Sequence, residues 1–77
     1  MNSVEMILAE VKAELHSAEE KFGPFASLHE GYAVLLEEVD ELWAEIKSKE
    51  SSVPALRKEA TQIAAMAVRF IKALDGG

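Results

Sequence analysis

The chain has no cysteine, which excludes a disulfide framework and a thiolate metal site. It has only two prolines and four glycines among its 77 residues, so few positions interrupt a helix. No apolar run approaches the roughly 20 residues that a membrane-spanning helix needs. The first residues carry no basic segment ahead of an apolar run, so we expect no signal peptide. These absences are compatible with a cytoplasmic protein that makes no membrane contact.

Basic residues are also few. The chain has 8 lysines and arginines against 14 aspartates and glutamates, a net charge of −6, and the basic residues are scattered. Because nucleic-acid binding needs a clustered basic face, we expect no nucleic-acid partner. An acidic protein that handles phosphates needs a metal ion to bridge the like charges. The apolar fraction of 49% is too high for a disordered chain.

The sequence does contain helical periodicity, and nothing in it has the pattern of a strand. Apolar residues recur at helical spacing over about residues 3–21, 27–49 and 53–74. Gly23 suits the end of the first helix, and Ser27 with Glu30 forms a capping box for the second. Ser52 is a plausible N-cap for the third. Gly31 costs roughly 1 kcal/mol inside a helix, and either permits close approach of another backbone or has no special role. We therefore expect one all-α domain over residues 1–77.

Two helices of this length do not fit a compact globule. A helix of about 23 residues is ~35 Å long, whereas a compact chain of this size has a radius of gyration of about 11–12 Å. The second and third helices should form a long antiparallel hairpin beside the first. Tyr32, Leu36 and Trp43 on one flank, and Ala64 and Val68 on the other, are surplus apolar positions. We expect a homodimer or homotetramer that completes a helical bundle.

Acidic residues on the second and third helices suggest a metal site. Glu38 and Glu41 share a helix face and Glu37 stacks near Glu41. Clustered carboxylates repel one another unless a cation or a base lies between them. Glu59 falls within the apolar arc of the third helix and needs a partner, and Gln62 follows one turn later. In an antiparallel hairpin the two pairs face each other, which gives oxygen-only ligation suited to Mg²⁺ or Mn²⁺.

The alternative is a solvated acidic face. The chain has 12 glutamates, so an E-E-x-x-E string arises by chance in roughly a quarter of such chains. A glutamate-rich helix face is usually only solvated or salt-bridged. Spacing alone therefore favours the solvated face over the metal site.

The paired motifs in their helical context resemble a known enzyme family. E-E-x-x-E at residues 37–41, followed by E-x-x-Q at 59–62, is similar to the MazG-like group of all-α nucleoside triphosphate pyrophosphohydrolases. The surrounding strings HEGYAVLLEEVDELW and RKEATQIAAMAVRFI resemble short phage- and bacterial-type members, and the resemblance covers about residues 28–74. It implies a helical dimer or tetramer that uses Mg²⁺ to hydrolyse a (d)NTP to the monophosphate and pyrophosphate, as in housecleaning of the nucleotide pool.

Site residues are carried over from this resemblance position by position. The first motif maps to Glu37, Glu38 and Glu41, and the second to Glu59 and Gln62, where the family's usual acid is an amide. The resemblance implies that Glu38, Glu41, Glu59 and Gln62 hold Mg²⁺ against the triphosphate. It implies that Glu37, Glu38 and Glu41 form the catalytic set, with Glu37 placed to orient the attacking water. The rival hypothesis, which Gln62 favours, is a non-catalytic helical module with a degenerate metal site that binds a nucleotide or a protein.

Four other residues have candidate roles. Lys58 and Arg69 lie on one side of the third helix and are candidates for holding phosphates; the alternative for each is an ordinary exposed helix cation. Trp43 could stack on a base, although a tryptophan on an apolar flank is more often a core or interface anchor. His29 has no second histidine or cysteine at ligand spacing, which excludes a typical zinc site and indicates a surface position.

Overall fold

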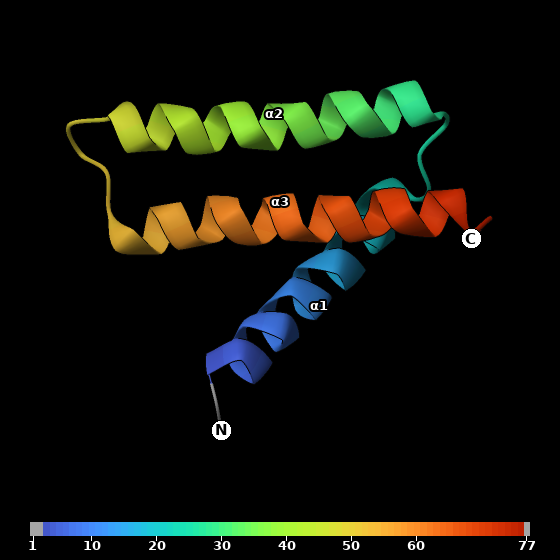
Figure 1. Ribbon diagram of the computed structural model, residues 1–77, viewed down its shortest axis with the longest axis horizontal. Coiled ribbons are helices and arrows are strands. Elements are labelled where there is room, and N and C mark those ends of the chain that lie inside the picture. The colour runs from blue at the N-terminus through green and yellow to red at the C-terminus, as the bar shows by residue number, and fades with distance from the viewer. Residues whose placement is uncertain (1–2, 77) are drawn as a thin grey trace.

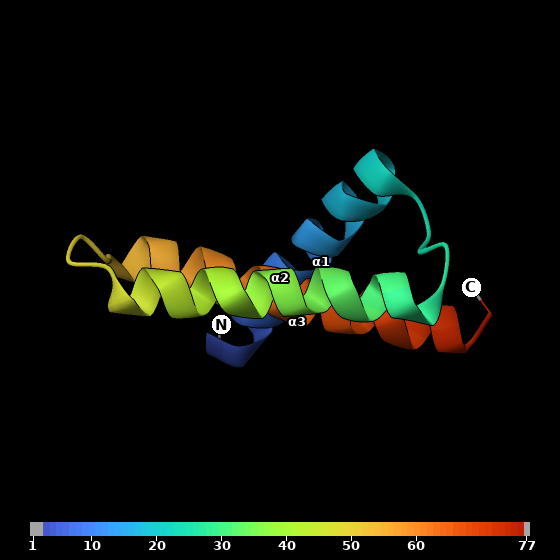
Figure 2. The same ribbon diagram turned by 90° about the horizontal axis from the view of Figure 1, so that it is seen from above.

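The computed structural model describes residues 3–76 and contains three α-helices. They are α1 (Ser3–Phe22), α2 (Leu28–Lys47) and α3 (Val53–Leu74). Helices α2 and α3 lie side by side and antiparallel, and α1 crosses the hairpin obliquely and packs against α3 (Figure 1, Figure 2). No strand occurs in residues 3–76. The predicted all-α fold, a hairpin with an N-terminal helix beside it, is confirmed.

Caps predicted from the sequence set most of the helix ends. Gly23 adopts a φ of 65°, the left-handed conformation that ends α1. The Ser27 hydroxyl accepts the N–H of Glu30 at 3.1 Å. The Glu30 carboxylate accepts the N–H of Ala26 at 2.8 Å, one residue earlier than in a standard capping box. The Ser52 hydroxyl caps α3 by accepting the N–H three residues further on, at 3.2 Å.

Helix α2 ends at Lys47, two residues before the predicted end. Ser48 leaves the helical region, with φ −68° and ψ 140°, and its N–H donates to the carbonyl of Glu45 at 3.1 Å. The Ser48 hydroxyl then accepts the N–H of Glu50 at 3.1 Å. Serine offers the backbone such local bonds in place of helical ones, and this competition ends the helix early.

The core is small and forms where α1 crosses the hairpin. Leu15 and Ala18 of α1 pack with Ala65 and Met66 of α3, all four buried. Residues from all three helices surround them: Val11, Val34, Leu35 and Val68. Val68 therefore belongs to the core, and its prediction as part of an outer contact face is wrong because α1 covers that side of α3.

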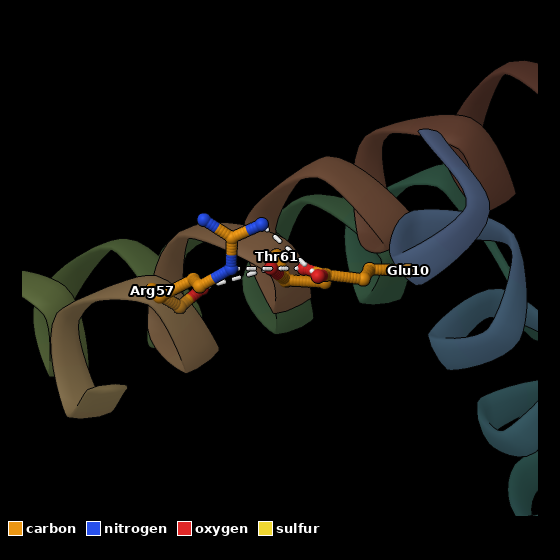
Figure 3. Close-up of polar contacts among 3 residues, drawn as sticks. All are labelled: Glu10, Arg57 and Thr61. Carbon is orange, nitrogen blue, oxygen red and sulfur yellow. Dashed lines mark hydrogen bonds and ion pairs between the residues drawn. The ribbon is translucent and has the colours of Figure 1, made fainter. Parts of the chain in front are cut away.

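Two ion pairs also fasten α1 to α3. The Arg57 guanidinium donates two hydrogen bonds of 3.0 Å to the carboxylate of Glu10, and its own carbonyl accepts the hydroxyl of Thr61 at 2.8 Å (Figure 3). Lys72 pairs with Glu19 near the other end of α1. The Arg57 pair is exposed and the Lys72 pair is partly buried, so neither contributes much to the stability of the fold. They link α1 to α3 at two positions along α1.

The side of α2 turned away from Glu38 is apolar and uncovered. We call it the apolar face; its residues are exposed by 41–62%, and they are Tyr32, Leu36, Val39, Trp43 and Ile46. Their spacing alternates between four and three residues, as in the seam of a coiled coil. The radius of gyration, 13.2 Å, exceeds the roughly 11–12 Å of a compact chain of this length. None of the described helices is long and apolar enough to cross a bilayer.

Candidate metal centre and the adjoining cavity

Three carboxylates meet where α2 and α3 run alongside each other. Glu38 and Glu41 lie one turn apart on α2, and the short connection at residues 48–52 returns the chain so that Glu59 of α3 comes beside them. One carboxylate oxygen from each residue lies within 4.8 Å of the other two. We call these three residues the acid cluster. Oxygens gathered from two helices in this way can share one cation.

Two oxygens of the acid cluster lack partners. Oε2 of Glu38 and Oε2 of Glu59 are buried and accept no hydrogen bond from the described residues. Glu38 and Glu59 are half-buried, whereas Glu41 is exposed. A buried acceptor left without a partner costs about 1–3 kcal/mol, and more when it is charged. Three carboxylates that each offer one oxygen to a shared point are oxygen-only ligation, so the donor set fits Mg²⁺.

The electrostatics of the acid cluster favour a bound cation or proton. Burial, followed by the charges of Glu41 and Glu59, raises the pKa of Glu38 to about 7. Burial and then Glu41 also raise the pKa of Glu59, against a smaller opposing effect of Lys58. Because a proton or a cation relieves this repulsion, cation binding at the cluster competes with protonation.

A cavity of about 550 Å³ adjoins the acid cluster between the three helices. Glu38 belongs to both, so the cavity opens onto the cluster. Its volume falls within the range typical of small-molecule sites, about 300–1,000 Å³. The wall combines apolar, aromatic and polar side chains: Glu14, Ser17, Ala18, Lys21, Phe22, Phe25, Glu30, Val34, Glu37, Glu38, Gln62, Met66 and Arg69.

Glu37 and Gln62 lie in the cavity wall, outside the acid cluster. Glu37 is exposed and Gln62 is half-buried. Their predicted roles, orienting water and ligating the metal, remain predictions. Glu37 and Gln62 nevertheless line the same cavity as Glu38.

The two candidate phosphate ligands occupy different surroundings. Lys58 is exposed and lines a second, shallower cavity between α1 and α3. Arg69 is only 7% exposed and is not an ordinary surface cation. Its guanidinium donates to the carbonyl of Gly23 at 2.8 Å and to the sulfur of Met66 at 3.2 Å, and lies 4.2 Å from the ring centroid of Phe25. Arg69 therefore fastens the α1–α2 connection to α3, and its phosphate role stays a prediction.

Sequence reasoning missed Glu14 of α1. This half-buried residue lines the cavity, and its charge contributes to the raised pKa of Glu38. The available signal was its position one turn from Glu10 on the face that also carries Val11 and Ala18. That signal could not place Glu14 near the acid cluster, because the crossing of α1 depends on contacts distant in sequence.

Gly31 makes room for aromatic rings. A Cβ atom at Gly31 would lie 2.9 Å from Cδ2 of Phe70 and 3.0 Å from Cδ2 of Phe25. The prediction of close packing at Gly31 was therefore right, but the close neighbours are the side chains of Phe70 and Phe25 and not another backbone. With Arg69 on one side and Gly31 on another, the ring of Phe25 is held in place at the cavity wall.

The remaining candidates lie away from the acid cluster. Trp43 is on the apolar face, 56% exposed, with the ammonium of Lys47 5.2 Å from its ring centroid. It does not line the cavity. His29 is exposed, as expected, and so is Asp40. Among the described residues, the acid cluster is the group of acidic and imidazole side chains close enough to hold a metal ion.

Comparisons with protein-family models, with curated proteins and with solved structures find no match to this chain. The resemblance to the MazG-like group therefore depends on the two paired motifs and their helical context. Functional inference starts from the acid cluster and the adjoining cavity.

Proposed function

We propose that the chain is a Mg²⁺-dependent, MazG-like nucleoside triphosphate pyrophosphohydrolase that acts on a (d)NTP in the cytoplasm. The observation that carries the proposal is the convergence of Glu38, Glu41 and Glu59 from two helices, with two buried oxygens left unpartnered. A purely solvated acidic face would not bury such oxygens. The adjoining cavity supplies space for a substrate next to the acid cluster.

The acid cluster would hold the metal ion, Mg²⁺ or Mn²⁺, with the Gln62 carbonyl as a candidate neutral ligand. When bound, the ion offsets the charge of the triphosphate and lowers the pKa of bound water. Water attacks a phosphorus atom of the substrate, pyrophosphate leaves, and the monophosphate remains. Glu37 is the candidate to orient that water and accept its proton, since it lines the same cavity as Glu38.

A second copy of the chain is the proposed partner of the apolar face. Five large apolar side chains exposed at coiled-coil spacing form one stripe along α2, and a stripe of this kind is typical of a protein-interaction surface. A short chain with a small core gains stability by burying them. Two copies packed through α2 would form a helical bundle, as a homodimer or as half of a homotetramer.

The rival function is a non-catalytic module that binds nucleotide or a protein. It is favoured by one feature, an amide at Gln62 where the family has an acid, since the lost charge weakens metal binding. Turnover separates the two functions, because both predict a folded helical protein and a filled cavity.

Pyrophosphate release from a panel of canonical and modified dNTPs, with Mg²⁺ or Mn²⁺, tests the enzyme proposal. We expect wild type to release pyrophosphate and the monophosphate, and Glu41→Gln to lose that activity. Asp40→Asn is the matched control, because it removes the same charge from an exposed neighbour outside the acid cluster. If the folded protein releases pyrophosphate from none of the substrates, the result would favour the non-catalytic module. Equal release by Glu41→Gln would reject the acid cluster as the active site.

A further inference from the structure

An exposed phenylalanine stands at the edge of the cavity. Phe22, the last residue of α1, leaves 73% of its surface in water and yet lines the cavity wall. Single exposed apolar residues are common on proteins, but this one is aromatic and adjoins a hollow of ligand size. Its exposed surface is available to pack against a ligand.

The rest of the cavity supports a flat, partly apolar ligand. Phe25, Val34 and Met66 give it apolar walls. Its polar groups are those of Ser17, Lys21 and Gln62, with the carboxylates of Glu14, Glu30 and Glu37 as acceptors for the N–H groups of a base edge. Phe25 is already packed against the guanidinium of Arg69 and above Gly31. The ring of Phe22 is mostly exposed, so its surface is free to contact a ligand.

The position of the acid cluster identifies the ligand class. Glu38 lies in both the acid cluster and the cavity wall. If the acid cluster held the triphosphate through a metal ion, the cavity would be the adjoining space for the nucleoside. A nucleobase is a flat ring with polar edges, and every base can stack on an aromatic side chain. Trp43 is unsuited to this role, because it lies on the apolar face and outside the cavity wall.

We propose that the cavity between α1, α2 and α3 is the nucleoside-binding site and that Phe22 stacks on the base. The proposal rests on the proposed function for its triphosphate anchor. It assigns α1 a direct part in substrate recognition, although both metal-binding motifs lie on α2 and α3.

Equilibrium binding separates the nucleoside contribution from the phosphate contribution. The probes are the four α,β-imido deoxynucleoside triphosphates, which resist cleavage, and inorganic tripolyphosphate, each titrated with Mg²⁺ by calorimetry. The variants are Phe22→Ala and Phe22→Trp. Leu8→Ala is the matched control, because Leu8 is on the same helix, is 61% exposed and does not line the cavity. Since Phe22 is exposed, its replacement should leave the fold intact.

We expect Phe22→Ala to weaken binding of the imido nucleotides about five- to hundredfold. Tripolyphosphate binding and the Mg²⁺-dependent rise in melting temperature should not change, and Phe22→Trp should restore nucleotide affinity. Unchanged nucleotide binding by Phe22→Ala would overturn the proposal. An equal loss for tripolyphosphate, or wild-type binding of nucleotide no tighter than tripolyphosphate, would overturn it as well.

The same data distinguish failure of this proposal from failure of the proposed function. Nucleotide binding that depends on Phe22, without pyrophosphate release, would support the nucleoside site and reject the enzyme. Pyrophosphate release with no dependence of binding on Phe22 would support the enzyme and reject the stacking role. No nucleotide binding by wild type would reject both.

Discussion

Replacing Glu38 with glutamine should stabilise the metal-free protein. In the folded chain the pKa of Glu38 is about 7, against 4.5 for an ordinary glutamate, because the carboxylate is buried beside Glu41 and Glu59. Ionising Glu38 above pH 7 therefore opposes folding. At about 1.4 kcal/mol per pKa unit, the penalty is at most about 3.5 kcal/mol, and partial solvent exposure reduces it to about 1–3 kcal/mol.

The sign of this effect fixes its pH dependence. Between pH 4.5 and pH 7 the folded state binds more protons at Glu38 than the unfolded state, so stability falls as the pH rises. Glu38→Gln removes this slope. Its advantage over wild type should be largest at pH 8 and should shrink toward pH 4.5.

Urea unfolding at pH 5 and pH 8, with and without Mg²⁺, measures these quantities. Without metal at pH 8, we expect Glu38→Gln to be more stable than wild type by about 1–3 kcal/mol. Mg²⁺ at ten times its dissociation constant should stabilise wild type by about 1.4 kcal/mol, and the variant much less. Asp40→Asn should change stability by less than about 0.5 kcal/mol at either pH. A variant no more stable than wild type at pH 8, or one whose advantage is the same at both pH values, would refute this reasoning.

Four further variants test the packing and the assembly. Gly31→Ala should lose about 1 kcal/mol in thermal denaturation, because overpacking against two rings outweighs the gain in helix propensity; a stabilised protein would contradict this. Arg69→Ala should cost about 2–3 kcal/mol in urea unfolding, because it removes buried contacts. Arg57→Ala should cost clearly less, because its ion pair with Glu10 is exposed; equal costs would refute the distinction. Val39→Glu should make the protein monomeric in sedimentation and move Trp43 emission to longer wavelength, and a wild type that is already monomeric would reject the interface.

Local signals in the sequence were sufficient to predict the helices. Serine caps and Gly23 define ends by bonds within four residues, so they can be read from the sequence. The end of α2 at Lys47 was missed because Ser48 ends the helix without a glycine or proline. The pairing of Glu38 with Glu59 was also predictable, since a short turn between two long helices sets their register.

The position of α1 was not predictable from local patterns. It depends on contacts between residues more than 40 apart, such as Glu10 with Arg57 and Arg69 with Gly23. For that reason the cavity, the participation of Glu14 and the burial of Arg69 emerged only from the structure. A charged residue on a helix is predicted to be solvated when the position of the helix or loop that covers it is unknown.

Paramagnetic broadening by Mn²⁺ tests directly whether the acid cluster binds a divalent metal ion. A small amount of Mn²⁺ is added to ¹⁵N-labelled protein, and the backbone amide signals are followed. If the acid cluster binds a divalent metal, the amide signals around Glu38, Glu41 and Glu59 should broaden selectively. Excess Mg²⁺ should reverse the broadening, and Glu38→Gln should not show it. Broadening spread evenly over the other acidic residues, or none at all, would contradict a metal site at the acid cluster.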